Sequence, residues 1–90
     1  MPYRVVFSHD ADRDLEHIYR YVAEHDSAWN ADRLLSSLID DCKSLANFPD
    51  RGNIPRELAQ AANLGYRELH RSPYRIVYRV HKDEVMVFVL

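Results

Sequence analysis

The C-terminal third of the chain contains three segments that suit β-strands: Leu64–His70 (LGYRELH), Tyr74–Val80 (YRIVYRV) and Val85–Leu90 (VMVFVL). They are rich in the β-branched and aromatic residues that strands favour. The connections, residues 71–73 and 81–84, are too short for a parallel crossover, which takes a dozen residues or more. We therefore predict a three-stranded antiparallel meander.

The middle segment has two chemically different faces, because side chains alternate along a strand. One face is apolar and aromatic, with Tyr74, Ile76, Tyr78 and Val80, and the other carries Arg75, Val77, Arg79 and His81. Arg67 and Arg71 lie on or beside the preceding segment, but the pattern leaves the hairpin register open. Leucine-rich helices match the apolar face better, so we expect Arg75 and Arg79 on an open face, free for a partner.

The N-terminal half is predicted to form one strand and two helices. Tyr3–Phe7 suits a strand, and Ser8 and Ser27 are natural N-caps of amphipathic segments. Apolar residues recur at helical spacing after both serines. They are Ala11, Leu15, Ile18 and Val22 in the first segment, and Ala31, Leu34, Leu35, Leu38, Ile39, Cys42, Leu45 and Ala46 in the second. The second, broader stripe predicts the more buried helix, and the short link predicts an antiparallel helical hairpin.

The complete order predicts an α+β fold, β-α-α-β-β-β, with the helical hairpin packed on one face of a small antiparallel sheet. Phe48-Pro49 ends the second helix, because the residue before a proline avoids helical geometry. Residues 56–62 contain enough helix formers for a short helical segment. The last strand is apolar on both faces, so we expect it inside the sheet or covered on both sides. The pattern does not place the first strand in the sheet.

Length and composition set several limits. Ninety residues make a single domain, residues 1–90. The net charge of −2 argues against a general nucleic-acid binder. No apolar run approaches the roughly 18 residues of a membrane span, and the first residues lack the apolar core of a signal peptide. We therefore expect a cytoplasmic protein without a membrane partner, in which Cys42 is a buried, inert thiol.

Motifs for metal, nucleotide and hydrolase chemistry are missing from the sequence. The histidines are scattered, and neither Cys-x-x-Cys nor His-Glu-x-x-His occurs. There is no glycine-rich phosphate loop and no serine or cysteine hydrolase motif. We predict no metal and no cofactor. The acidic residues Asp10, Asp12, Asp14 and Glu16 are interpreted as a solvated helix face, with docking of a basic partner as the alternative.

The arginines of the meander are the candidate functional residues. Arg67, Arg75 and Arg79 could be structural cross-strand partners of Glu68 and Glu84. They could instead form an electropositive patch, because the forked guanidinium suits phosphate and carboxylate. The residue pattern leaves both interpretations open. The tyrosines of the meander are predicted to pack on the sheet, with their hydroxyls at its rim.

Two motifs resemble the C-terminal signature of ParE-type toxins in the ParE/RelE toxin–antitoxin superfamily: GYREL at 65–69 and SPYRIVYRV at 72–80. The resemblance covers essentially the whole chain. It implies the RelE/ParE-like α+β fold and the toxin of a bacterial type II, plasmid-stabilising system. It also implies a cognate, ParD-like antitoxin whose disordered part folds into a groove between helical hairpin and sheet edge. Trp29, Leu34 and Leu58 are the candidate antitoxin contacts.

The resemblance leaves two kinds of target. ParE toxins trap DNA gyrase on cleaved DNA, whereas RelE-like toxins cut messenger RNA on the ribosome with an acid or base often placed on the last strand. Residues 85–90 contain no titratable side chain, and general acid–base catalysis needs one near the scissile bond. Gyrase inhibition without catalytic residues is therefore the implied function. The candidate toxicity or target-binding residues are Arg67, Tyr74, Arg75, Tyr78 and Arg79. A ribosome-dependent nuclease and a non-toxic relic that still binds its antitoxin are the alternatives.

Overall fold

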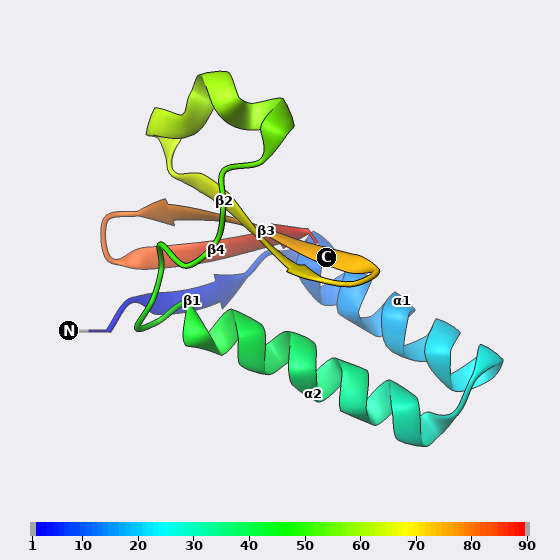
Figure 1. The fold of residues 1–90 in the computed structure, drawn as a ribbon. Coiled ribbons are helices and arrows are strands. Elements are labelled where there is room, and N and C mark those ends of the chain that lie inside the picture. Colours follow the sequence, from blue (N-terminus) through cyan, green and yellow to red (C-terminus); the bar gives the residue numbers. More distant parts are fainter. Residues whose placement is uncertain (1, 90) are drawn as a thin grey trace.

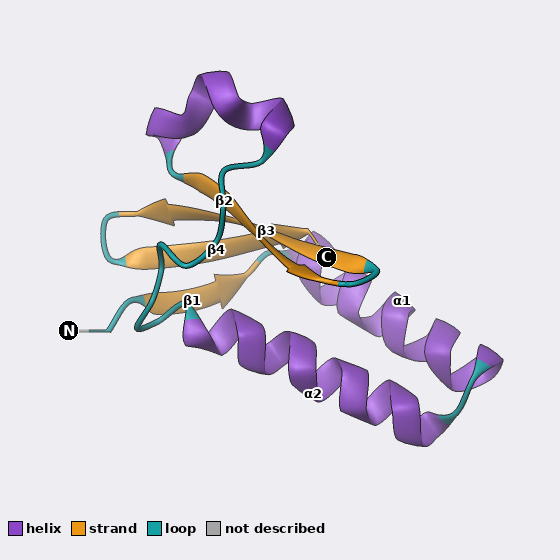
Figure 2. Ribbon diagram, viewed as in Figure 1, coloured by secondary structure: helices purple, strands orange, loops and turns teal. Residues whose placement is uncertain are grey.

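The computed structural model describes residues 2–89, and its elements follow the predicted order. They are β1 (Arg4–Phe7), α1 (His9–His25), α2 (Ala28–Ser44), the 3-10 helix η1 (Arg56–Leu64), β2 (Tyr66–Arg71), β3 (Tyr74–His81) and β4 (Glu84–Val89). The helical hairpin packs on the sheet, and its α1–α2 connection lies farthest from the strands (Figure 1). Figure 2 shows η1 beside β2, at one edge of the sheet. The predicted α+β fold is confirmed, with Leu90 outside the described residues.

The sheet has four strands in the order β1-β4-β3-β2. Both the β2–β3 and the β3–β4 pairs are antiparallel, so the predicted meander is confirmed. β1 lies parallel to β4, however, and the expectation of an antiparallel sheet is wrong for this strand. Parallel neighbours need a long connection, and the helices and two further strands lie between β1 and β4 in the chain. The inner position of β4 agrees with its two apolar faces.

Local sequence explains both helices. The Ser8 hydroxyl accepts a hydrogen bond from the backbone N–H of Ala11, and the Ser27 hydroxyl accepts one from Asn30, each at 3.0 Å. These bonds satisfy N–H groups that have no partner inside the helix. α2 buries three residues (Ala31, Leu38 and Cys42) where α1 buries Ala11, so the second helix is the more buried one, as predicted.

The hydrophobic core lies between the helical hairpin and the aromatic face of β3. It joins Ala11, Leu38, Cys42, Leu45, Leu69, Ile76, Tyr78, Val85 and Val87. The prediction that the hairpin covers the face of Ile76 and Tyr78 is therefore confirmed, and Arg75 and Arg79 lie on the opposite face. Cys42 is fully buried, as expected, and this desolvation raises the pKa of its thiol to about 12.

The segment between α2 and β2 closes the outer edge of the sheet. The backbone N–H of Asn53 donates to the carbonyl of Glu68 at 2.9 Å, and the N–H of Glu68 donates back at 2.7 Å. This single bridge pairs polar groups that an edge strand would otherwise leave open. η1 then follows where a short helix was predicted. Within residues 2–89, no helix has the length and apolarity to cross a membrane.

Candidate functional site

The β2–β3 register divides the predicted site residues between the two faces of the sheet. Directly paired residues in adjacent strands point to the same face. Arg67 pairs with Tyr78, so it lies on the helix-covered face, which also holds Tyr74. Arg75 and Arg79 lie on the open face. The five candidate target-binding residues therefore do not form one patch.

Tyr78 and Arg67 are engaged with the loop before η1. The Tyr78 hydroxyl donates to the carbonyl of Pro49 at 2.8 Å and accepts from the N–H of Gly52 at 3.1 Å. A terminal nitrogen of Arg67 donates to the Gly52 carbonyl at 2.7 Å. Tyr78 is fully buried, and this desolvation raises the pKa of its phenol. Both side chains thus hold residues 49–52 against the sheet.

Arg75 is paired on the open face. Its Nη1 lies 2.6 Å from Glu57 Oε1 on η1 and 2.9 Å from Glu68 Oε2 on β2. The hydrogen bond with Glu57 is the main cause that raises the pKa of Arg75, and the negative charge of Glu57 is the second. Glu68 is only 6% exposed, and its other oxygen accepts from Asn53 Nδ2 and contacts His70 Nε2 at 2.9 Å. Arg75 is therefore a structural partner of Glu68, and the expectation that it is free for a partner is wrong, because the buried Glu68 carboxylate takes up its charge.

Arg79 has a different environment. Its Nε donates to the carbonyl of Leu64 at 2.8 Å, and its guanidinium carbon lies 5.4 Å from the centre of the Tyr66 ring. The expected partner, Glu84, forms its ion pair with Arg4 instead. Within residues 2–89, Arg79 makes no ion pair with a carboxylate. It is thus an ordered guanidinium that stays available to an acidic group of another molecule.

Arg79 belongs to a line of side chains that crosses the open face. Tyr66 pairs with Arg79, Arg79 with Met86, and Met86 with Val6, so one residue from each strand lies side by side. The Phe88 ring, whose centre lies 6.0 Å from that of Tyr66, adjoins this line. We call these five residues the cross-sheet row. All five are half-buried, and the helical hairpin packs on the other side of the sheet.

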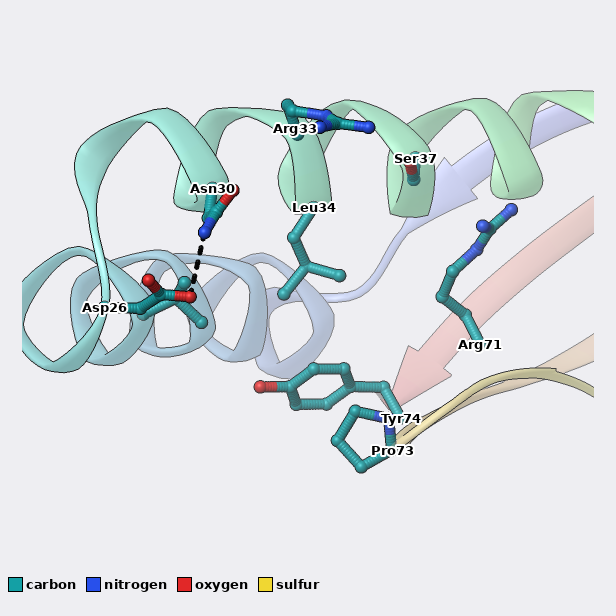
Figure 3. Close-up of a pocket in the computed structure, with 9 residues that line it drawn as sticks. Asp26, Asn30, Arg33, Leu34, Ser37, Arg71, Pro73 and Tyr74 are labelled. Atoms are coloured by element: carbon teal, nitrogen blue, oxygen red, sulfur yellow. Dashed lines mark hydrogen bonds between the residues drawn. The ribbon is translucent and has the colours of Figure 1, made fainter.

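A separate groove of about 420 Å³ lies between the helical hairpin and the β2–β3 turn. Its apolar lining comprises Val22, Leu34, Pro73 and Tyr74, and its polar lining comprises Asp26, Asn30, Arg33, Ser37 and Arg71. Figure 3 shows the Leu34 side chain directed toward Tyr74 across this space. The groove has the position predicted for the antitoxin.

Only one of the three predicted antitoxin contacts lines this groove. Leu34 does so, while Trp29 is 70% exposed in a different hollow on α2. Leu58 is half-buried on η1, which lies beside β2, and it does not line the groove. Arg71, at the rim of the groove, is held by two hydrogen bonds to Asp41, at 2.7 and 2.9 Å. The groove therefore has an apolar lining with Arg71, fixed by Asp41, at its rim.

The cluster of His70, Glu68 and Arg75 is the arrangement nearest to acid–base chemistry. One oxygen of Glu68 accepts from Asn53 and contacts His70, and the other accepts from Arg75, so the carboxylate positions its neighbours. General acid–base cleavage of a phosphodiester needs both an acid and a base at the scissile bond, and in this cluster His70 and Glu68 contact each other at 2.9 Å. No group of three or more metal-ligating side chains occurs in the part of the chain that the structure describes.

The sequence pattern did not single out Val6, Tyr66, Met86 and Phe88 as functional residues. Tyr66 was interpreted as a packing residue, and the other three as ordinary strand residues. Met86 and Phe88 alternate with the buried Val85 and Val87, and this alternation is the signal that places them on the open face. Which residues of β3 and β2 lie beside them depends on the register.

The chain is similar to known toxin–antitoxin proteins. A family model described as the ParE toxin of the type II toxin–antitoxin system parDE matches residues 5–90. A chain of the chromosomal ParDE system from Pseudomonas aeruginosa is 21% identical, with a TM-score of 0.79 over 97% of this chain and 91% of that chain. A chain of the RelBE2 toxin–antitoxin complex from Mycobacterium tuberculosis is 26% identical, with a TM-score of 0.66 over 97% and 93%. No curated protein matches the sequence significantly.

Proposed function

The chain belongs to the ParE toxin family of type II toxin–antitoxin systems, and we propose that it inhibits DNA gyrase in the cytoplasm and is neutralised by a cognate antitoxin. One observation carries the choice of target: the open face of the sheet offers an ordered arginine, Arg79, that pairs with no carboxylate of the described residues. Arg79 lies there among apolar side chains, while Arg75 is already paired with Glu57 and Glu68. A toxin that holds gyrase on cleaved DNA needs such a surface and no proton donor of its own.

The five candidate toxicity residues receive different roles in this proposal. Arg79 contacts the target. Arg75 positions η1 and β2, and Arg67 and Tyr78 position the loop before η1. Tyr74 faces the groove between the hairpin and the β2–β3 turn, so we assign it to the antitoxin side.

The second candidate function is a RelE-like, ribosome-dependent nuclease, which the cluster of His70, Glu68 and Arg75 favours. An imidazole held by a carboxylate can carry a proton, and a guanidinium can bind phosphate. Two features weigh against it. Arg75 would have to leave Glu57 to reach a phosphate, and residues 85–89 supply no second titratable group.

The antitoxin is proposed to fill the groove that Leu34 lines. Val22, Leu34 and Tyr74 offer apolar surface, and Arg33 and Asp26 offer charges beside it. Such a lining suits a disordered segment that folds into an amphipathic helix on binding.

The test uses the purified chain with bacterial DNA gyrase and relaxed plasmid. We expect supercoiling to stop and cleaved plasmid to accumulate, and we expect the antitoxin encoded by the neighbouring gene to reverse both effects. Transcripts should stay intact when the toxin is expressed in cells. Codon-positioned cleavage of messenger RNA, with gyrase unaffected, would replace gyrase inhibition by the nuclease function. Normal growth with tight antitoxin binding would identify a non-toxic relic.

A further inference from the structure

We propose that the cross-sheet row is the surface that binds gyrase, and that it takes an apolar segment of gyrase whose carboxylate pairs with Arg79. The inference rests on the proposed function and adds to it the docking surface and the chemistry of the segment that docks. The row comprises Val6, Tyr66, Arg79, Met86 and Phe88, with at least one residue from each strand.

Charge on the open face singles out Arg79. Three strand arginines lie on this face, and two have acidic partners: Arg4 pairs with Glu84, and Arg75 pairs with two glutamates. Arg79 has a backbone carbonyl and an aromatic ring as partners, and its two terminal amino groups make no hydrogen bond to residues 2–60 or 64–88. A carboxylate from another molecule is the group that complements them best, through a two-pronged hydrogen bond.

Arg79 is also held in place before any partner arrives. The bond from its Nε to the Leu64 carbonyl and the stacking over Tyr66 restrict a side chain that is otherwise flexible. Ordering a flexible arginine side chain on binding costs free energy, because the side chain loses its rotamer freedom. A guanidinium that the fold has already ordered loses less entropy in the complex, so the same contact contributes more to affinity.

The neighbours of Arg79 make the pair stronger than a surface ion pair. Tyr66, Met86, Phe88 and Val6 are half-buried, and a segment laid across them would exclude water from the guanidinium. Charge-assisted hydrogen bonds gain strength where water is excluded. Arginine and aromatic residues surrounded by apolar contacts are also the usual energetic centres of protein interfaces. The segment that fits is therefore apolar with one Asp or Glu at its centre.

The position of the row assigns it to gyrase and not to the antitoxin. The groove proposed for the antitoxin is lined by helix residues and by the β2–β3 turn, whereas every member of the row lies on the side of the sheet opposite the helical hairpin. An antitoxin segment in the groove would thus leave the row uncovered. The target of a free toxin, in contrast, must find an exposed surface that is already formed.

Charge reversal at Arg79 tests the proposal. We expect Arg79→Glu to raise the toxin concentration that half-inhibits gyrase supercoiling by about tenfold or more, a typical effect for an interface centre. Arg79→Lys keeps the charge but loses the fork, and should cost about threefold. Arg13→Glu, the same charge change on exposed α1, is the matched control and should inhibit like the wild type. Affinity for the antitoxin, measured by calorimetry, should be unchanged in all three.

Three outcomes would overturn the inference. Inhibition by Arg79→Glu at the wild-type concentration would remove Arg79 from the gyrase contact. Loss of antitoxin binding with gyrase inhibition retained would assign the row to the antitoxin. If wild-type toxin leaves gyrase active, the proposed function fails first, and the inference fails with it. Should Arg79→Glu unfold, Arg79→Met, which keeps the apolar stem without the charge, takes its place and is expected to lose at least as much potency as Arg79→Lys.

Discussion

Arg75 on β3 reaches across the open face of the sheet to Glu68 on β2, with 2.9 Å between its Nη1 and the Glu68 Oε2. Glu68 is nearly inaccessible to water, and a buried carboxylate without a partner is strongly unfavourable. The same nitrogen of Arg75 also binds Glu57, so this guanidinium joins η1 to the sheet. Sequence alone suggested Arg75 as a target contact, whereas the fold uses it to link η1 to β2 and to balance the charge of Glu68.

The first prediction compares Arg75 with Arg4, which also forms one of the open-face ion pairs. Arg75→Ala should lower the urea midpoint of unfolding more than Arg4→Ala does, because it leaves Glu68 buried without its guanidinium. The Arg4–Glu84 pair lies at the surface, where ion pairs contribute little to stability. Equal midpoints for the two variants would show that Glu68 does not depend on Arg75.

The Tyr78 hydroxyl provides a second prediction. Tyr78→Phe removes the partner of the Pro49 carbonyl and of the Gly52 N–H, and should lower the free energy of unfolding by about 1–3 kcal/mol. Tyr74→Phe is the matched control, because the Tyr74 hydroxyl makes no hydrogen bond within residues 2–89, and it should change stability by less than about 0.5 kcal/mol. Urea unfolding of both variants measures the difference. If Tyr78→Phe leaves the free energy of unfolding unchanged, water has taken over the hydrogen bonds of the hydroxyl.

The third prediction separates the antitoxin candidates. Leu34→Asn places an amide in the apolar part of the groove and should weaken antitoxin binding by about tenfold or more. Trp29→Ala, outside that groove, should leave the affinity unchanged. Gyrase inhibition by both variants should equal that of the wild type. If Trp29→Ala is instead the variant that loses the antitoxin, the antitoxin lies on the outer side of α2.

The fourth prediction concerns pH and Cys42. Burial holds the pKa of this thiol at about 12, above its ordinary value, so the folded protein keeps the proton that the unfolded chain releases first. Stability is therefore constant below the unfolded pKa and falls as the pH rises from about 9 toward 12. Tyr78, whose pKa is also raised, adds to the loss at the alkaline end. Cys42→Ala should show a shallower alkaline loss, measured by urea unfolding across this range.

Reactivity of Cys42 provides an independent check. The thiolate is the reactive form, and a buried thiol with a raised pKa stays protonated at pH 8. We expect a thiol reagent to modify the folded protein slowly and the urea-unfolded protein quickly. Equal rates would show that the helix α2 opens readily around Cys42.

Some features of this protein follow from short segments of sequence. The serine caps, the helical stripes, the strand alternation and the short turns of the meander act over a few residues, so the element order and the two faces of β3 were predictable. The position of the helical hairpin over Ile76 and Tyr78 was predictable for the same reason, since only that face matches the leucine stripes. The length of each connection likewise established that β2, β3 and β4 are antiparallel.

The features that form the site depend on contacts between distant parts of the chain. Nothing local in Val5 or Val6 indicates that β1 lies parallel to β4, because that pairing joins residues about eighty positions apart. The β2–β3 register places Arg67 under the helices and Arg79 beside Tyr66, and a shift of one residue would exchange the faces. The partners of Arg75 come from η1 and β2 together. Sequence thus established which arginines lie on the sheet, and only packing decided that Arg75 is paired while Arg79 stays available.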